Sequence, residues 1–99
     1  MVFYSPAALA DLERLAEFLL ATDPNAAAET GRILMEAIAM LASHPLVGRI
    51  VESGLRELVI SRGRSGYVAL YRFDAETDQV FILAIRHQRE LSAASPEEK

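Results

Sequence analysis

Hydrophobic and polar residues follow two different periods along this chain of 99 residues. Residues 1–4 form a short apolar run, and between positions 9 and 41 apolar residues recur every three or four positions, which is typical of amphipathic helices. From position 55 onward, runs rich in Val, Ile, Leu, Tyr and Phe are separated by turn-forming clusters, which indicates strands. The pattern predicts the order strand, helix, helix, strand, strand, strand.

Two capping residues followed by proline mark the starts of the helices. Ser5 can cap with its hydroxyl, and Pro6 suits the first helical position, where no N–H is needed. Asp23 and Pro24 repeat this arrangement and begin a second helix, which is predicted to run through Ser43. The short link between the helices predicts an antiparallel helical hairpin. The first helix carries a predicted leucine stripe, formed by Leu9, Leu12, Leu15, Ala16 and Leu19. Four residues lie opposite this stripe and are expected to face water: Asp11, Glu13, Arg14 and Glu17.

Three runs form a predicted antiparallel meander: residues 55–60, 66–73 and 79–86. The last run is apolar at every position from Val80 to Ile85, so it must be covered on both faces and lie in the middle of the sheet. In the preceding strand, alternation places Tyr67 and Tyr71 on one face, where they are expected to pack in the core. Residues 46–54 contain two glycines and are predicted to be a loop.

The predicted fold class is α+β, with the element order β-α-α-β-β-β. A helical hairpin is expected to pack on one face of a mostly antiparallel four-stranded sheet. The other face is expected to be covered by nothing in this chain. Residues 1–90 are expected to form a single domain, since a chain of this length has room for one core. Residues 91–99 are polar and are expected to be a frayed tail.

The composition adds a reason to expect a partner. Apolar residues make up 52% of the chain, and the mean hydropathy is slightly positive, which is high for a small monomer. An oligomer or a covering partner is therefore expected. There is no cysteine and there are two histidines, so no metal site and no cofactor are predicted. No run approaches a membrane span and the start of the chain has no basic leader, so a cytoplasmic location is expected.

The charge distribution separates the two halves of the chain. The formal net charge is −4, which argues against strong direct binding of nucleic acid. Seven of the nine arginines nevertheless lie between positions 49 and 89. In a meander, the turn after the first of the three strands and the end of the last lie at the same end of the sheet. Five residues are therefore predicted to form a cationic corner that contacts an acidic partner or target: Arg62, Arg64, Arg86, His87 and Arg89.

Four segments in this order resemble one known family. They read YSPAALADLERLAEFL, HPLVGRIVESGLRELVI, SGYVALYRF and VFILAIRHQRE. Across roughly residues 3–90, the chain resembles the ParE branch of the RelE/ParE superfamily of type II toxins. The resemblance implies a toxin of the plasmid-stabilisation type that is neutralised by a ParD-like antitoxin with a ribbon-helix-helix head. It also implies a hetero-oligomer with that antitoxin and inhibition of DNA gyrase by binding. A homodimer is the alternative that the hydropathy leaves open. Relatives often end shortly after IRHQRE, whereas this chain continues with LSAASPEEK.

The same superfamily offers an enzymatic alternative. Toxins of the RelE type cleave ribosome-bound messenger RNA, and they resemble this chain except at the residues expected for catalysis. Where they carry lysines on the second strand, this chain has Arg56 and Glu57, and where they carry an arginine after Gly-Tyr, it has Val68. No tyrosine follows Tyr71, and Lys99 is the single lysine.

No catalytic residue is therefore predicted, and the chain is expected not to be an enzyme. Six residues remain candidates for binding a partner or target: Arg56, Arg62, Arg64, Arg86, His87 and Arg89. An RNase would use Arg56, Arg86, His87 and Arg89 instead. His87 is also compatible with a hydrogen-bonded strand-end histidine of purely structural role. A third alternative is a non-toxic relic that binds only an antitoxin.

Overall fold

The computed structural model describes residues 1–62 and 65–88, with all of their side chains except those of Ser61, Arg62 and Ser65. The predicted tail, residues 91–99, lies outside the described residues. Eight elements follow one another: β1 (Val2–Tyr4), α1 (Pro6–Thr22), α2 (Pro24–Ala39), the short 3₁₀ helix η1 (Met40–Ala42), β2 (Arg49–Glu52), β3 (Leu55–Arg62), β4 (Ser65–Asp74) and β5 (Gln79–His87).

The sheet has five strands in the order β1-β5-β4-β3-β2. β1 pairs with β5 in parallel, and the other neighbours are antiparallel. The predicted α+β class and the central place of β5 are confirmed. The predicted number of strands is wrong, because residues 49–52 form β2 instead of part of a loop. This strand has only two apolar residues and depends on pairing with β3, where Arg49 forms an ion pair with Glu57.

Both helices begin where the capping residues predict. The Ser5 hydroxyl accepts a hydrogen bond from the Ala8 N–H at 3.0 Å, and the Asp23 carboxylate accepts one from the Ala26 N–H at 3.3 Å. Each cap satisfies an N–H that the first helical turn leaves without a partner. α2 ends at Ala39, earlier than predicted, because the chain tightens there into η1.

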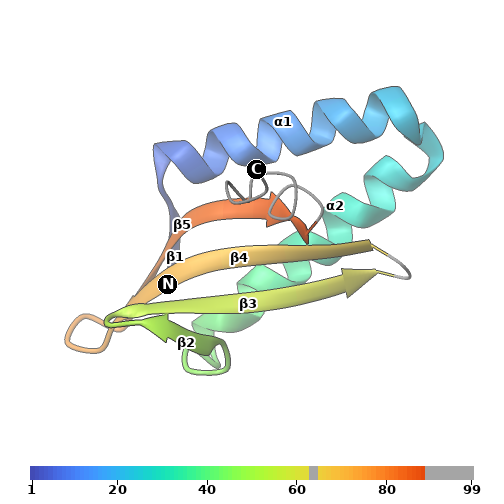
Figure 1. Ribbon diagram of the computed structural model, residues 1–99. Coiled ribbons are helices and arrows are strands. Elements are labelled where there is room, and N and C mark those ends of the chain that lie inside the picture. Colours follow the sequence, from blue (N-terminus) through green and yellow to red (C-terminus); the bar gives the residue numbers. More distant parts are fainter. Residues whose placement is uncertain (63–64, 89–99) are drawn as a thin grey trace, which may run out of the picture.

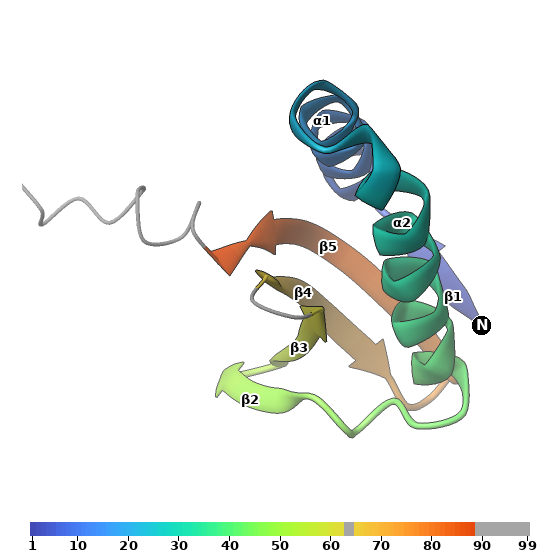
Figure 2. The ribbon, with the colours of Figure 1, turned by 90° about the vertical axis from the view of Figure 1, so that its right-hand side faces the viewer.

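The two helices lie on the same side of the sheet. Figure 1 shows α1 running along β5, with α2 crossing behind the strands, and Figure 2 shows both helices on one side of the curved sheet. No helix of residues 1–62 and 65–88 covers the opposite side, hereafter the outer face. None of the described helices is long and apolar enough to cross a membrane.

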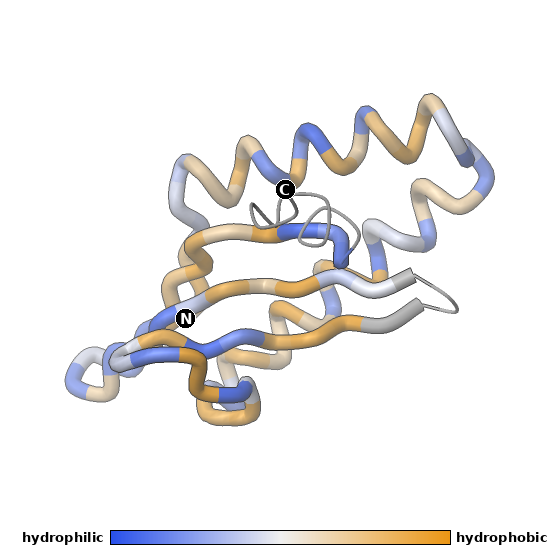
Figure 3. Tube along the Cα trace, viewed as in Figure 1, coloured by the Kyte–Doolittle hydropathy of each residue, from blue (hydrophilic) through white to orange (hydrophobic). Residues whose placement is uncertain are grey.

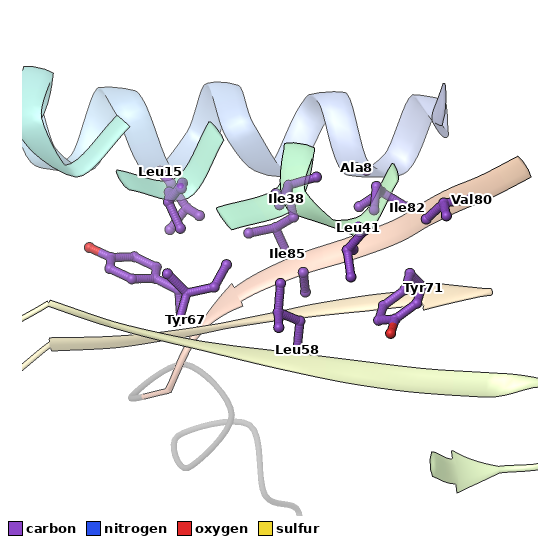
Figure 4. Close-up of a cluster of buried hydrophobic side chains, with 13 residues drawn as sticks. Ala8, Leu15, Ile38, Leu41, Leu58, Tyr67, Tyr71, Val80, Ile82 and Ile85 are labelled. Carbon is purple, nitrogen blue, oxygen red and sulfur yellow. The ribbon is translucent and has the colours of Figure 1, made fainter. Parts of the chain in front are cut away.

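The hydrophobic core fills the space between the helices and the inner face of the sheet (Figure 4). It includes Tyr67 and Tyr71, so their prediction as core residues is confirmed. Burying a side chain of the size of leucine or isoleucine contributes about 1.5–3 kcal/mol. The strands contribute more core residues than the helices: Leu58, Ile60, Tyr67, Ala69, Tyr71, Val80, Ile82 and Ile85, against Ala8, Leu15, Leu34, Ile38 and Leu41.

Candidate functional site

Arg56 is separated from the other candidates and is used within the fold. It lies at the start of β3, at the end of the strand opposite to Arg62. Its guanidinium donates hydrogen bonds to the carbonyl oxygens of Leu46 and Gly48, at 3.1 and 2.8 Å. These bonds tie the chain before β2 to the sheet, so Arg56 acts first as a structural residue.

The neighbouring Tyr71 completes this attachment, and its hydrogen bonds were missed by sequence reasoning. Its side chain is fully buried, and its hydroxyl donates to the Pro45 carbonyl at 2.7 Å and accepts from the Gly48 N–H at 2.9 Å. A Cβ on Gly48 would lie 2.5 Å from that hydroxyl and 2.9 Å from the Glu57 carbonyl oxygen. Gly48, Arg56 and Tyr71 together are named the loop anchor. Residue 48 must be glycine, because any larger residue would prevent this close approach of the loop to Tyr71.

Arg86, at the other end of the sheet, is held by a carboxylate. Its guanidinium lies 2.6 Å from a carboxylate oxygen of Asp11 on α1. The same carboxylate oxygen accepts the Ile85 N–H at 2.9 Å. Beyond the end of β1 at Tyr4, β5 has no neighbouring strand on this side, so Asp11 takes the place of a strand partner. The prediction that Asp11 faces water is wrong, since its side chain is only 14% exposed.

His87 lies on the opposite side of β5 from Arg86. It pairs with Tyr67 across the inner, helix-covered face, and the two rings meet edge to face with centroids 5.0 Å apart. Arg86 pairs with Val68, which belongs to the outer face. Consecutive residues of a strand point to opposite faces, so alternation alone could have given this result. The two residues therefore share an end of the sheet and extend from opposite faces of β5.

The remaining residues of the cationic corner are placed only in part. Arg62 ends β3 opposite Ser65, at the same end of the sheet as His87, so the predicted position of this strand end is confirmed. The side chain of Arg62, and the whole of Arg64 and Arg89, lie outside the described residues. Figure 3 shows that the end of β5 is hydrophilic, whereas the middle of the same strand is hydrophobic. Contact of this corner with a partner stays a prediction.

The outer face of the sheet is less bare than the sequence suggests. The Phe81 ring stacks with Phe3, with centroids 5.6 Å apart, and the Arg72 guanidinium lies over the same ring at 4.8 Å from its centre. Val68 is buried although it belongs to this face, whereas Val59 is exposed. Side chains of the sheet itself therefore cover part of its apolar surface.

The helical hairpin carries exposed apolar surface that the sequence reading did not identify. Leu9, Phe18 and Leu20 of α1 are all more than half exposed. Between α1 and α2 lies an apolar groove of about 220 Å³, and Gly31 leaves it open because no atom lies within 4 Å of where its Cβ would be. The signal was available in the sequence, since Phe18 and Leu20 lie off the leucine stripe of α1.

The described residues do not gather the groups that metal binding would need. No cluster of three histidine or carboxylate side chains occurs among them. The pKa of Tyr4 is raised by burial, and its hydroxyl lies 3.9 Å from the Met35 sulfur, which links β1 to α2. The arrangement is suited to contact with another macromolecule through charges and apolar side chains.

Comparisons with known proteins relate the chain to ParE and RelE toxins. The family described as "ParE toxin of type II toxin-antitoxin system, parDE" matches residues 2–92. Two curated relatives come from Caulobacter vibrioides. Toxin RelE3 is 38% identical over 85 residues, covering 86% of this chain and 90% of the relative, and Toxin RelE1 is 41% identical over 71 residues, covering 72% and 76%.

Two solved structures share the fold. A chain of the chromosomal ParDE TA system from P. aeruginosa superposes with a TM-score of 0.71 at 21% identity, covering 86% of this chain and 91% of the other. A chain of the RelBE2 toxin-antitoxin complex from Mycobacterium tuberculosis superposes with a TM-score of 0.58 at 27% identity, covering 88% and 95%. The shared architecture extends over most of each chain.

Proposed function

Because this chain belongs to the ParE toxin family of type II toxin–antitoxin systems, we propose that it inhibits DNA gyrase by binding and is neutralised by a ParD-like antitoxin. Its place of action is the cytoplasm, and its role is that of a plasmid-stabilisation toxin. The antitoxin carries a ribbon-helix-helix head, and its remaining segment covers apolar surface of the toxin.

The observation that carries this proposal is the separation of the candidate RNase residues. An RNase needs cationic groups and a proton-transfer group around one scissile phosphate. Here the Arg56 guanidinium is bonded to the carbonyls of Leu46 and Gly48 at one end of the sheet. At the other end, Arg86 and His87 extend from opposite faces of β5, and the Arg86 guanidinium is bound by Asp11. A binding toxin needs no convergent site of this kind.

The surface of the helices supports an antitoxin partner. Leu9, Phe18 and Leu20 expose apolar area at different points around α1. The apolar groove between α1 and α2, which Gly31 leaves open, adds a second exposed apolar surface. Exposed apolar surface is commonly an interaction site in soluble proteins when it is extensive. The antitoxin would shield this surface, and the cationic corner would remain for gyrase, with Arg86 fixed by Asp11 while its side chain is 43% exposed.

Gyrase supercoiling provides the test. The chain is purified with its antitoxin, separated in denaturant, refolded and added to gyrase with relaxed plasmid. We expect loss of supercoiling, restored by added antitoxin. Arg86→Gln should weaken inhibition, whereas the matched variant Arg32→Gln on exposed α2 should not. Undiminished supercoiling at a large excess of refolded toxin would remove gyrase as the target.

A RelE-type RNase is the second candidate, because the two curated relatives are named RelE toxins. Its site would draw on Arg56, Arg86, His87 and Arg89. Ribosome-dependent cleavage of messenger RNA by the refolded chain, abolished by His87→Ala, would establish this activity. If neither activity is found and expression without antitoxin leaves growth unchanged, the chain is a non-toxic antitoxin-binding relic.

A further inference from the structure

β2 is an edge strand with an unusual concentration of exposed apolar side chains. Ile50 and Val51 are 63% and 41% exposed, and Leu46 and Val47 just before the strand are 60% and 55% exposed. These four residues are named the edge patch. β2 pairs with β3 on one side, and no strand of residues 1–62 and 65–88 pairs with its other side. An open edge of this kind is a template for pairing with another chain.

Two opposite charges flank the apolar residues on one face of β2. Arg49 lies opposite Glu57, and Glu52 lies opposite Leu55. Since Leu55 and Glu57 are two residues apart on β3, they share a face, and the residues opposite them share that face too. Arg49 and Glu52 are three positions apart, and in a regular strand such residues face opposite sides. The register shift between Ile50 and Glu52 brings them to the same face.

We propose that the edge patch is a homodimer interface, occupied by β2 of a second copy of this chain. In an antiparallel two-fold arrangement, Arg49 of each copy meets Glu52 of the other on the same face of the joined sheets. Ile50 and Val51 of the two copies meet near the axis between these charges. The interface is isologous, since one surface is complementary to itself.

The charges select a second copy over other occupants. A partner of single charge would satisfy either Arg49 or Glu52 and repel the other, whereas the antiparallel self-pair satisfies both. Arg49 pairs with Glu57 of its own chain, but its side chain is 74% exposed, so the guanidinium can also contact Glu52 of the second copy. Glu52 has no ion pair within the described part of the chain, so its carboxylate is available to the second copy.

The position of the edge patch leaves the other surfaces free. β2 and β1 are the two outermost strands of the sheet, and α1 runs beside β5, on the side of β1 (Figure 1). Dimerisation through β2 would therefore leave the exposed side chains of α1 open to an antitoxin. Each copy in the dimer could bind its own antitoxin chain.

Sedimentation equilibrium of the refolded full-length chain tests the proposal over a wide range of concentrations. The wild type should shift from one to two chain masses as concentration rises. Ile50→Lys should raise the dimer dissociation constant about tenfold or more, because it places two like charges near the axis. Leu9→Lys is the control: it adds the same charge at a side chain 53% exposed on α1 and should leave the constant unchanged.

A charge exchange tests the pairing itself. Arg49→Glu and Glu52→Arg should each weaken self-association, because each variant brings like charges together. When the two variants are mixed, they should form a heterodimer, because residue 49 of each copy then meets an opposite charge at residue 52 of the other. Refolding is checked by circular dichroism before mixing.

A monomeric wild type at every concentration, equal effects of Ile50→Lys and Leu9→Lys, or a mixture no more associated than its components would each overturn the proposal. These measurements are independent of gyrase, so they fail separately from the proposed function.

Discussion

The loop anchor and the cationic corner hold their arginines in different ways. At the loop anchor, Arg56 donates to two main-chain carbonyls, and the buried Tyr71 hydroxyl bonds the same segment. At the cationic corner, Arg86 is held by the Asp11 carboxylate and keeps 43% of its side chain exposed. An arginine bonded to carbonyls fixes the fold, whereas a partly exposed arginine held by a carboxylate can also present charge to a partner.

The largest expected effect concerns Gly48 in the loop anchor. Gly48→Ala places a methyl group 2.5 Å from the Tyr71 hydroxyl and should lower the free energy of unfolding by about 2–4 kcal/mol. Urea denaturation measures this. Gly31→Ala is the matched control, because no atom lies within 4 Å of the added Cβ and alanine favours the helix, so stability should rise by up to about 1 kcal/mol. Equal effects at both glycines would contradict the loop anchor.

Removing the Tyr71 hydroxyl should have the next largest effect. Tyr71→Phe leaves the Gly48 N–H and the Pro45 carbonyl without this partner, at a cost of about 1–3 kcal/mol in unfolding free energy. Tyr4→Phe serves as control at neutral pH, since it loses only a 3.9 Å contact with sulfur, and its effect should be below about 0.5 kcal/mol. Similar losses for both variants would show that the hydrogen bonds of the Tyr71 hydroxyl contribute no more to stability than the contact of the Tyr4 hydroxyl.

Exchanging the two arginines for glutamine separates stability from activity. Arg56→Gln should lower the unfolding free energy by about 1–2 kcal/mol through lost charged hydrogen bonds, and the folded variant should still inhibit gyrase. Arg86→Gln should lower it by less than about 1 kcal/mol, because solvent screens this partly exposed pair, while inhibition falls. Paired urea and supercoiling measurements check this, and the reverse assignment of effects would break the comparison.

The smallest expected effect is a pH dependence of stability caused by Tyr4, which lies outside both the loop anchor and the cationic corner. Burial raises the pKa of Tyr4 above 10.0, so the folded chain keeps this proton where the unfolded chain begins to lose it. The resulting stability is fully present below pH 10.0 and is lost as pH rises through the folded pKa. Relative to Tyr4→Phe, the wild type should therefore lose unfolding free energy above pH 10.0. A constant difference between the two proteins would contradict this.

Local features were predictable from the sequence. The caps at Ser5 and Asp23 depend on residues three positions away, so the start of each helix could be placed before the structure was seen. The meander was equally accessible, because its strands are long, apolar and joined by short turns. The order of strands in the meander also predicted that Arg62 and His87 lie at the same end of the sheet.

Features that depend on distant residues were not predictable. β2 is stabilised by pairing with β3, and Gly48 is constrained by Tyr71, 23 residues further along the chain. Asp11 lies opposite the leucine stripe of α1, yet it binds β5 because β1 ends too early to pair there. No helical period can reveal such a contact.

Gyrase supercoiling and messenger RNA cleavage, measured side by side on one refolded preparation, test the central claim most directly. The account predicts that the chain stops supercoiling and accumulates cleaved plasmid DNA, that messenger RNA in a translating extract stays intact, and that antitoxin restores gyrase. Active gyrase at a large toxin excess, together with cleaved messenger RNA, would contradict it.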